Sequence, residues 1–302
     1  MQFYDFRTTR DWTQQNEGVK NIDADEFYGN HFAFAMRQGW AASANQMFLE
    51  HTWERNRRPY YNVYPSILPM LLRLNLALDT EFVTLPVPVF SIRLPQEPHA
   101  LSFPDNGSDY SIRSMLVGHS TGLRNAGNVY PGLVIWMDTG EREQSAKGLP
   151  VPIHTYINLP LSDDMTLEDA IHALPYDTTV FHGMRLPEEI RTACVRLVCT
   201  LCLLDNDPSL IEPDVLNRDT GKPLSEQIID RAKRRGKYGW NVGKGIEVIP
   251  HVRRPHPAVM WTGHGRTSPR IVLRKGSVVH RDTIMRLPSG YSPEPEEIKD
   301  GE

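Results

Sequence analysis

The residues best suited to chemistry lie between positions 250 and 286, where histidines alternate with arginines and glycines. Two short blocks carry them, Pro–His–Val–Arg–Arg–Pro–His–Pro at 250–257 and Thr–Gly–His–Gly–Arg at 262–266. Histidine exchanges a proton near neutral pH and can serve as a general acid or base. Arginine can hold a phosphate group through two parallel N–H bonds. The combination favours binding or chemistry at phosphate groups.

The predicted nucleic-acid-binding residues are the cations of this region and one aromatic ring on which a base could stack. They are Arg253, Arg254, Arg266, Arg270, Arg274, Lys275 and Trp261. Gly263 and Gly265 would let the backbone approach a ligand closely. The same residues also fit a β-hairpin with a polar turn and an exposed basic face. The sequence leaves the binding site and the plain hairpin both open.

If the protein is an enzyme, His256 and His264 are the predicted catalytic residues. A metal-independent endoribonuclease or toxin-like effector needs such an acid–base pair and a cation beside the phosphorus. A two-metal nuclease needs several carboxylates, whereas residues 231–286 contain only Glu247 and Asp282. We therefore predict no metal site and no cofactor.

The charge distribution supports phosphate as the target. Residues 231–286 carry fourteen Lys or Arg against two acids, a net charge of +12, although the whole chain has a net charge of −4. Residues 1–230 carry −12 in compensation. The basic region could bind RNA or DNA, dock on the acidic body of its own chain, or serve a protein partner. The leading prediction is a nucleic-acid-binding protein, and a protein-binding regulator that uses the acidic body is a further alternative.

The three cysteines, at 194, 199 and 202, are clustered in one segment. Their C-x4-C-x2-C spacing is similar to one iron–sulfur pattern. However, apolar residues recur at a helical period from 186 to 204, and a helix would spread the three thiols over an arc of about 140°. We therefore interpret the cysteines as small buried hydrophobic residues of a helix.

The elements that must position the basic region have an α+β pattern. The sequence predicts a helix over 24–56, with Asp23 or Asp25 as its cap and Gly39 as a weak point. The apolar residues available for its core face are Phe27, Phe32, Met36, Trp40, Met47 and Phe48. A second helix is predicted over 66–78, a short one over 166–173, and another over 223–235. Strands are predicted at 111–117, 133–137, 151–159 and 178–183, in a mixed or antiparallel sheet.

Proline placement predicts a sheet edge near residue 87. Pro86 and Pro88 lack N–H donors at alternate positions, so one side of an extended 82–94 segment could not pair. The segment could also be a connector. Further short strands are predicted at 246–249, 258–261, 270–273 and 278–279, which makes the basic region β-rich.

The predicted organisation is an acidic α+β body at 1–235, a basic β-rich region at 236–290 and a disordered tail at 291–302. Gly236 to Gly245 is rich in glycine and marks the division. The chain shows neither a signal-peptide pattern nor an apolar run of membrane-spanning length, so we expect a cytoplasmic protein without a membrane partner.

Two resemblances concern short segments. The C-terminal block, H-x-R-R-x-H followed by an apolar strand and G-x-G-R, resembles the end of uncharacterised proteins encoded on plasmids and phages, which implies a mobile genetic element. Val180-Phe181-His182-Gly183 resembles the aromatic-His-Gly motif of ADP-ribosyltransferases, in which the histidine holds the NAD ribose. A cysteine-bearing helix follows here in place of that family's next strand, leaving Tyr238 and Glu247 as the candidate partners.

Overall fold

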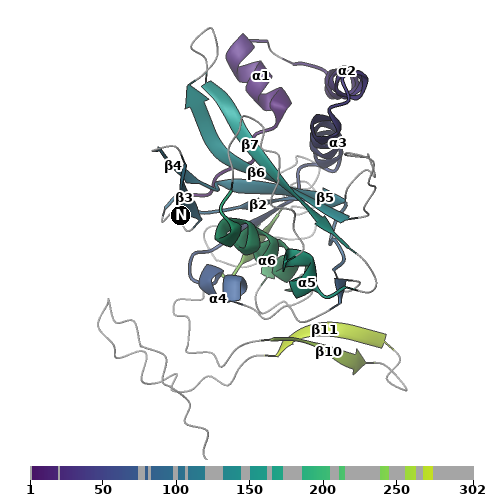
Figure 1. The fold of residues 1–302 in the computed structure, drawn as a ribbon, viewed down its shortest axis with the longest axis vertical. Coiled ribbons are helices and arrows are strands. Elements are labelled where there is room, and N and C mark those ends of the chain that lie inside the picture. Colours follow the sequence, from purple (N-terminus) through teal and green to yellow (C-terminus); the bar gives the residue numbers. More distant parts are fainter. Residues whose placement is uncertain are drawn as a thin grey trace, which may run out of the picture.

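The chain adopts an α+β fold whose centre is a seven-stranded mixed sheet with helices on both faces (Figure 1). This is a computed structural model that describes residues 2–19, 21–73, 79–80, 83–97, 101–105, 108–119, 132–143, 150–161, 165–172, 186–204, 211–214, 239–244, 256–262 and 268–274. The predicted fold class, with helices at the N-terminus and a mixed sheet, is confirmed.

The central sheet has the strand order β7-β6-β5-β2-β1-β9-β8. β1 is parallel to β2 and β9, and the other neighbours are antiparallel. The strands are β1 (Tyr60–Val63), β2 (Val89–Arg93), β5 (Ser114–His119), β6 (Gly132–Glu143), β7 (Pro150–Pro160), β8 (Ile211–Pro213) and β9 (Trp240–Val242). Two small antiparallel pairs accompany it, β3 (Ser102–Asp105) with β4 (Ser108–Ser111) and β10 (His256–Thr262) with β11 (Ser268–Arg274).

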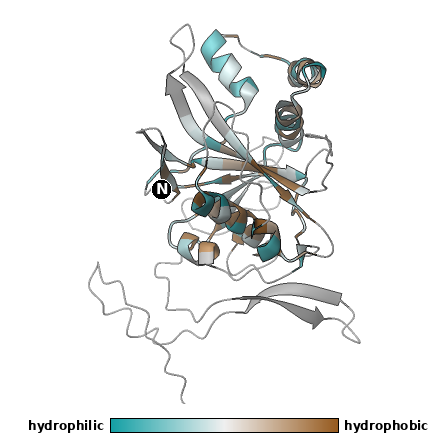
Figure 2. Cartoon of the chain, in the orientation of Figure 1, coloured by the Kyte–Doolittle hydropathy of each residue, from teal (hydrophilic) through white to brown (hydrophobic). Residues whose placement is uncertain are grey.

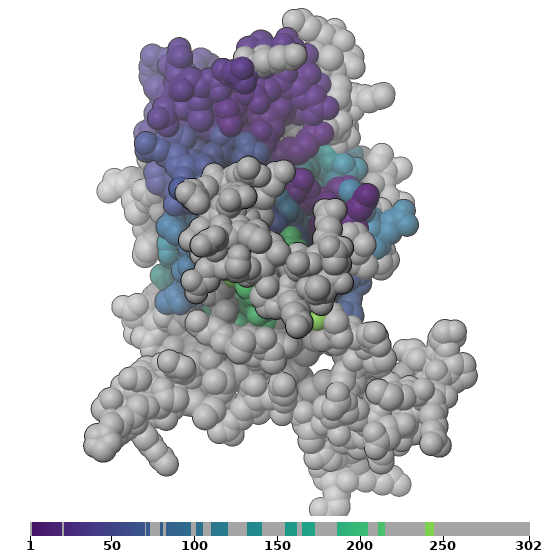
Figure 3. All heavy atoms as spheres, turned by 180° about the vertical axis from the view of Figure 1, so that it is seen from behind, coloured from purple at the N-terminus to yellow at the C-terminus, as the bar shows by residue number. Residues whose placement is uncertain are grey.

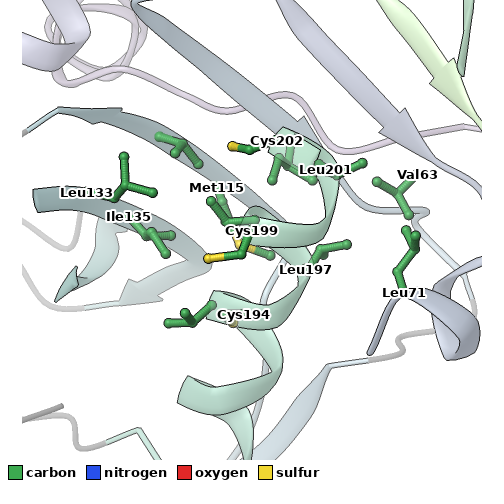
Figure 4. Close-up of a cluster of buried hydrophobic side chains, with 14 of the residues drawn as sticks. Val63, Leu71, Met115, Leu133, Ile135, Cys194, Leu197, Cys199, Leu201 and Cys202 are labelled. Carbon is green, nitrogen blue, oxygen red and sulfur yellow. The ribbon is translucent and has the colours of Figure 1, made fainter. Parts of the chain in front are cut away.

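One face of the sheet, here called the α6 face, is covered by α4 (Leu68–Arg73), α5 (Leu167–His172) and α6 (Glu188–Leu204). α6 packs an apolar stripe against the sheet. Figure 2 shows hydrophobic residues in brown where the helix and the strands meet. All three cysteines lie in this core beside strand residues such as Met115 and Ile135 (Figure 4). Burial raises the pKa of the Cys194 and Cys199 thiols to about 12. The interpretation of the cysteines as buried hydrophobic residues is confirmed.

The opposite face, here called the α3 face, is only partly covered by apolar side chains. α1 (Thr9–Glu17), α2 (Ala24–Arg37) and α3 (Ala41–Arg55) form one end of the molecule, seen in purple in Figure 3. From α3, Leu49 and Trp53 pack on Leu116 and Trp136 of the sheet. Trp53 also donates its indole N–H to the Pro59 carbonyl over 2.8 Å, which fixes α3 to the entrance of β1.

The single helix predicted over 24–56 is wrong, because two helices occupy this segment. Asp23 caps α2 by accepting from the Glu26 N–H, as predicted. The chain then turns at Gly39, whose φ of 72° favours glycine. Of the predicted core residues Phe27 and Met47 are buried, Phe32 is half-buried, and Met36, Trp40 and Phe48 are exposed. The break redirects the chain, so one helical stripe no longer faces one core.

The predicted sheet edge is also wrong. β2 begins at Val89, after both prolines, and lies between β1 and β5 in the interior of the sheet. The prolines therefore remove no donor from the strand itself. The predicted second helix is α4, the short helix is α5 with Thr166 accepting from the Asp169 N–H, and the strands near 111–117, 133–137, 151–159, 258–261 and 270–273 are present. The segments predicted at 178–183, 223–235, 246–249, 278–279 and 291–302 lie outside the described residues.

Within the described part of the chain, none of the helices combines the length and apolar character that a bilayer crossing requires.

Candidate functional site

The predicted phosphate-binding residues that the structure describes lie on the β10–β11 ribbon. The backbone pairing is antiparallel, with His256 opposite Arg274 and Met260 opposite Arg270. Residues that face each other share one side of a ribbon, and alternate positions share that side too. His256, Arg270 and Arg274 therefore occupy positions on one side. Trp261 falls on the other side, with Val259, Ile271 and Leu273.

The remaining predicted residues lie outside the described part of the chain. They are Arg253, Arg254, His264, Arg266 and Lys275. The Val180–Gly183 motif and its candidate partners Tyr238 and Glu247 lie outside it too. Their roles stay predictions, and so does the stacking role of Trp261.

The basic region is anchored in the central sheet. β9, which belongs to this region, pairs with β1 on one side and β8 on the other. Just beyond β9, the Lys244 ammonium lies 3.4 Å from the Glu212 carboxylate. One cation of the basic region is thus neutralised by the acidic body. At the other end of the region, part of β11 approaches α6.

A row of polar residues crosses the α3 face from β8 to β6. Strand register aligns Glu212, Asn241, Asn62, Arg93, Ser114 and Asp138 from strand to strand. The residues that alternate with them, such as Tyr61, Phe90 and Ile92, belong to the core of the α6 face. Because strand side chains alternate between faces, these strands present apolar residues to the α6 face and the polar row to the α3 face.

Asp214 organises the β1–β9 end of the row. Its carboxylate accepts from the Tyr60 hydroxyl over 2.7 Å, from the Asn241 amide over 2.9 Å and from the Asn62 amide over 3.2 Å. The Asn62 amide also donates to Oδ1 of Asn241 over 3.1 Å. Burial raises the pKa of the Tyr60 hydroxyl well above its usual value, and the Asp214 charge adds to this. Tyr60 therefore stays a neutral donor to Asp214.

Arg93 lies next to this cluster in a fixed orientation. Its guanidinium carbon is 3.5 Å from the centroid of the Tyr60 ring, a cation–π contact. One of its terminal nitrogens lies 2.7 Å from Oδ1 of Asp5. The side chain of Arg93 is 19% exposed and that of Asp5 is 70% exposed. The guanidinium group of Arg93 thus extends from the sheet toward the surface, where it contacts Asp5 of the N-terminal segment.

Several polar atoms around Arg93 are buried and unsatisfied. Among the described residues no hydrogen-bond partner is found for Nε of Arg93, Oγ of Ser91, Oγ of Ser114 or Oδ1 of Asn62. These four residues, here called the Arg93 cluster, sit on the adjacent strands β1, β2 and β5 in two consecutive rows. Buried polar groups are normally paired, so such a concentration calls for an explanation. The cluster brings a guanidinium, two hydroxyls and an amide oxygen together on one face of the sheet.

Sequence reasoning missed the Arg93 cluster. The alternation of Ser91 and Arg93 with Phe90 and Ile92 was a usable signal, since it predicts a strand with one polar face. Asn62 between Tyr61 and Val63 gave the same signal in β1. The sequence did not show that β1, β2 and β5 are neighbours, because residues 64–88 and 94–113 separate them along the chain.

The fold defines an α+β protein with a mixed sheet between two layers of helices. Neither a family model nor a curated protein matches the sequence. Among solved structures, the chain is similar to the crystal structure of AcrVA2, with a TM-score of 0.47 and 14% sequence identity, covering 89% of this chain and 90% of that one. At this level of similarity the function has to be argued from the residues themselves.

Proposed function

We propose that this is a nucleic-acid-binding protein of a mobile genetic element, and that the basic region 231–286 contacts phosphates. The observation that carries the proposal is the net charge of +12 in a region that includes a two-stranded ribbon. The link to a plasmid or phage rests on the C-terminal H-x-R-R-x-H block described above.

The ribbon has a geometry that suits a nucleic-acid groove. A two-stranded antiparallel ribbon fits the major groove of B-form DNA. Arg270 and Arg274 are four residues apart on β11, so their positions lie roughly 13 Å apart on the same side of the ribbon. The two cations would therefore reach different phosphates of the DNA backbone. The apolar positions of the opposite side suit packing against protein.

The test is a salt series with duplex DNA, single-stranded DNA and RNA. Charge reversal of both cations, R270E/R274E, should reduce the slope of log affinity against log salt by about two, because two phosphate contacts are lost. R37E/R55E is the matched control, since it makes the same change of net charge at two exposed positions of α2 and α3. Equal loss in both variants, or absence of binding at low salt, rejects the proposal.

A second candidate function is a metal-independent endoribonuclease. The pairing of His256 with Arg274 favours it, because an acid–base residue and a cation then occupy opposed positions on one side of the ribbon. Incubation of total RNA with the protein and a chelator should give cleavage products that H256A does not produce. Intact RNA with the unaltered protein excludes this activity and leaves binding alone.

A further inference from the structure

We propose that the Arg93 cluster is a binding site for a phosphoryl group, and that the Asp5 carboxylate occupies part of this site in the free protein. The site lies on the α3 face of the central sheet and uses none of the residues of the β10–β11 ribbon. The proposal for this site is therefore independent of nucleic-acid binding by the basic region.

The chemical character of the unsatisfied atoms points to a phosphate ester. Nε of Arg93 is a charged donor, and the hydroxyls of Ser91 and Ser114 are donors that can turn toward an anion. Hydroxyls and an arginine fork are the groups that hold phosphate oxygens. Oδ1 of Asn62 is a carbonyl oxygen and can only accept, and the amide N–H groups of the same side chain already donate to Asp214 and Asn241. The ligand must therefore also carry a donor, such as a sugar hydroxyl or a base amino group.

The spacing of the cluster suits a group of phosphate size. Ser114 is the cross-strand neighbour of Arg93, and Ser91 precedes Arg93 by two residues on the same face. Neighbouring strands are about 4.8 Å apart, and alternate residues of a strand are about 6.7 Å apart. The three donors thus lie at three corners of one square of the α3 face, whose fourth corner is Leu116, and the Ser91 and Ser114 side chains are buried there. Asn62, across from Arg93 on β1, borders the next square.

Asp5 is a displaceable occupant. Its Oδ1 lies 2.7 Å from a terminal nitrogen of Arg93, and its side chain is mostly exposed to water. Exposed ion pairs of this kind contribute little to stability. The N-terminal segment is held separately by its backbone, since the Tyr4 N–H donates to the Leu94 carbonyl and the Gln96 N–H donates to the Gln2 carbonyl. A ligand oxygen could therefore replace the Asp5 carboxylate while the backbone of this segment keeps its place.

The nearby Asp214 does not prevent anion binding. Its charge is shared among three donors, from Tyr60, Asn62 and Asn241. Through Tyr60 it also fixes the ring on which the Arg93 guanidinium stacks. Asp214 thus acts as a positioning group for the fork, and the fork remains the charge closest to the ligand.

The experiment measures binding by isothermal titration calorimetry in phosphate-free buffer, with inorganic phosphate, adenosine 5′-monophosphate and adenosine as probes. Asp5→Ala should raise the affinity for inorganic phosphate by about two- to fivefold, because it removes a weak internal competitor. Ser114→Ala should lower that affinity at least threefold, because it removes one donor to the anion. Adenosine, which lacks the phosphoryl group, should not bind.

The matched control is Thr155→Val. Thr155 has a buried hydroxyl without a partner among the described residues, but it lies beside Ile157 and Leu159 on the β7 side that faces the α6 core. This variant should leave phosphate affinity unchanged. Phosphate binding that Asp5→Ala and Ser114→Ala leave unaltered overturns the proposal, and so does absence of binding at millimolar phosphate. Circular dichroism and thermal unfolding verify that each variant is folded.

Two arms separate the sources of the phosphoryl group. Stronger binding of adenosine 5′-monophosphate than of inorganic phosphate indicates a free nucleotide. Preference for a 5′-phosphorylated oligonucleotide over the same oligonucleotide with a 5′-hydroxyl indicates a nucleic-acid end. R270E/R274E should not alter inorganic phosphate binding at the Arg93 cluster. Absence of nucleic-acid binding at the ribbon and absence of phosphate binding at the Arg93 cluster therefore give different results.

Discussion

Two buried polar clusters on the α3 side of the molecule differ in how completely their hydrogen-bonding groups are satisfied. The first surrounds the α3 residues Glu50 and Glu54. Glu54 accepts from the Tyr28 hydroxyl over 2.9 Å, from Arg58 over 2.7 Å and from Arg10. Glu50 accepts from the N–H and the hydroxyl of Thr9 and from Gln46. We call this the helical carboxylate cluster.

The second is the Arg93 cluster, where four side-chain atoms have no partner among the described residues. In the helical carboxylate cluster, Thr9 and Arg10 of α1 and Tyr28 of α2 donate to α3, so these hydrogen bonds connect one helix to another. The Arg93 cluster lies on three adjacent strands that backbone hydrogen bonds already connect. Saturated polar groups thus hold the helices together, whereas the unsatisfied groups of the sheet contribute nothing to its connectivity. That difference separates scaffold from candidate site.

The largest effect is expected from Glu54→Ala. The substitution leaves Arg10, Arg58 and the Tyr28 hydroxyl without their shared acceptor in a site where the Glu54 side chain is only 7% exposed. Removing one partner of a buried ionic network typically costs about 3–5 kcal/mol. Urea denaturation should show a loss of unfolding free energy of this size. Glu17→Ala at the exposed end of α1 is the control and should change stability by less than about 0.5 kcal/mol. Comparable losses of unfolding free energy in the two variants would contradict the role of Glu54 in holding the helices together.

The second effect is a pH dependence that originates in Glu50. Burial raises the pKa of this carboxyl to about 8 from the ordinary 4.5, against the opposing effect of its three hydrogen-bond donors. Because the folded pKa is the higher one, the contribution of Glu50 to stability is fully present below pH 4.5. It is lost as the pH rises from 4.5 to 8, where the unfolded chain releases the proton first. The unfolding free energy should fall by a few kcal/mol across this window.

Glu50→Gln isolates this contribution. Glutamine cannot ionise, so the variant should lose less stability than the unaltered protein between pH 5 and pH 8, although its amide group faces the Thr9 N–H less favourably. Chemical denaturation at several pH values measures both slopes. Parallel slopes would mean that Glu50 is ionised in the fold and that its three donors outweigh its burial.

The scaffold was more predictable from sequence than the site. The helical period around Cys194 and Cys199 predicted α6 and its burial, and Asp23 predicted the start of α2, because both signals are local. Gly39 was recognised as a weak point, but its φ of 72° and the turn it allows depend on how α3 packs. The Arg93 cluster depends on register between strands distant in sequence, which periodicity cannot supply. The basic region was the reverse case: its charge of +12 was visible in composition, whereas the pairing of β9 with β1 and of β10 with β11 was not.

The smallest effect, and the one with the opposite sign, is expected from Ser114→Ala. A buried hydroxyl without a partner costs free energy in the fold, so its removal should be neutral or stabilise the protein by up to about 1 kcal/mol in phosphate-free buffer. Thr200→Val is the contrasting variant, because the buried Thr200 hydroxyl donates to the Leu71 carbonyl. Its loss should destabilise the protein by about 1 kcal/mol. Both values come from urea denaturation.

Adding phosphate gives this last measurement its discriminating power. If phosphate binds the Arg93 cluster, it stabilises the unaltered protein more than Ser114→Ala, since only the former offers the hydroxyl to the anion. The difference in stability between the two proteins should therefore shift in favour of the unaltered protein as phosphate is added. The Thr200→Val difference should stay constant, because Thr200 belongs to the α6 core. If the stability difference between the unaltered protein and Ser114→Ala does not change with phosphate, the Arg93 cluster binds no phosphate. The contrast between a scaffold cluster and a binding cluster is then wrong.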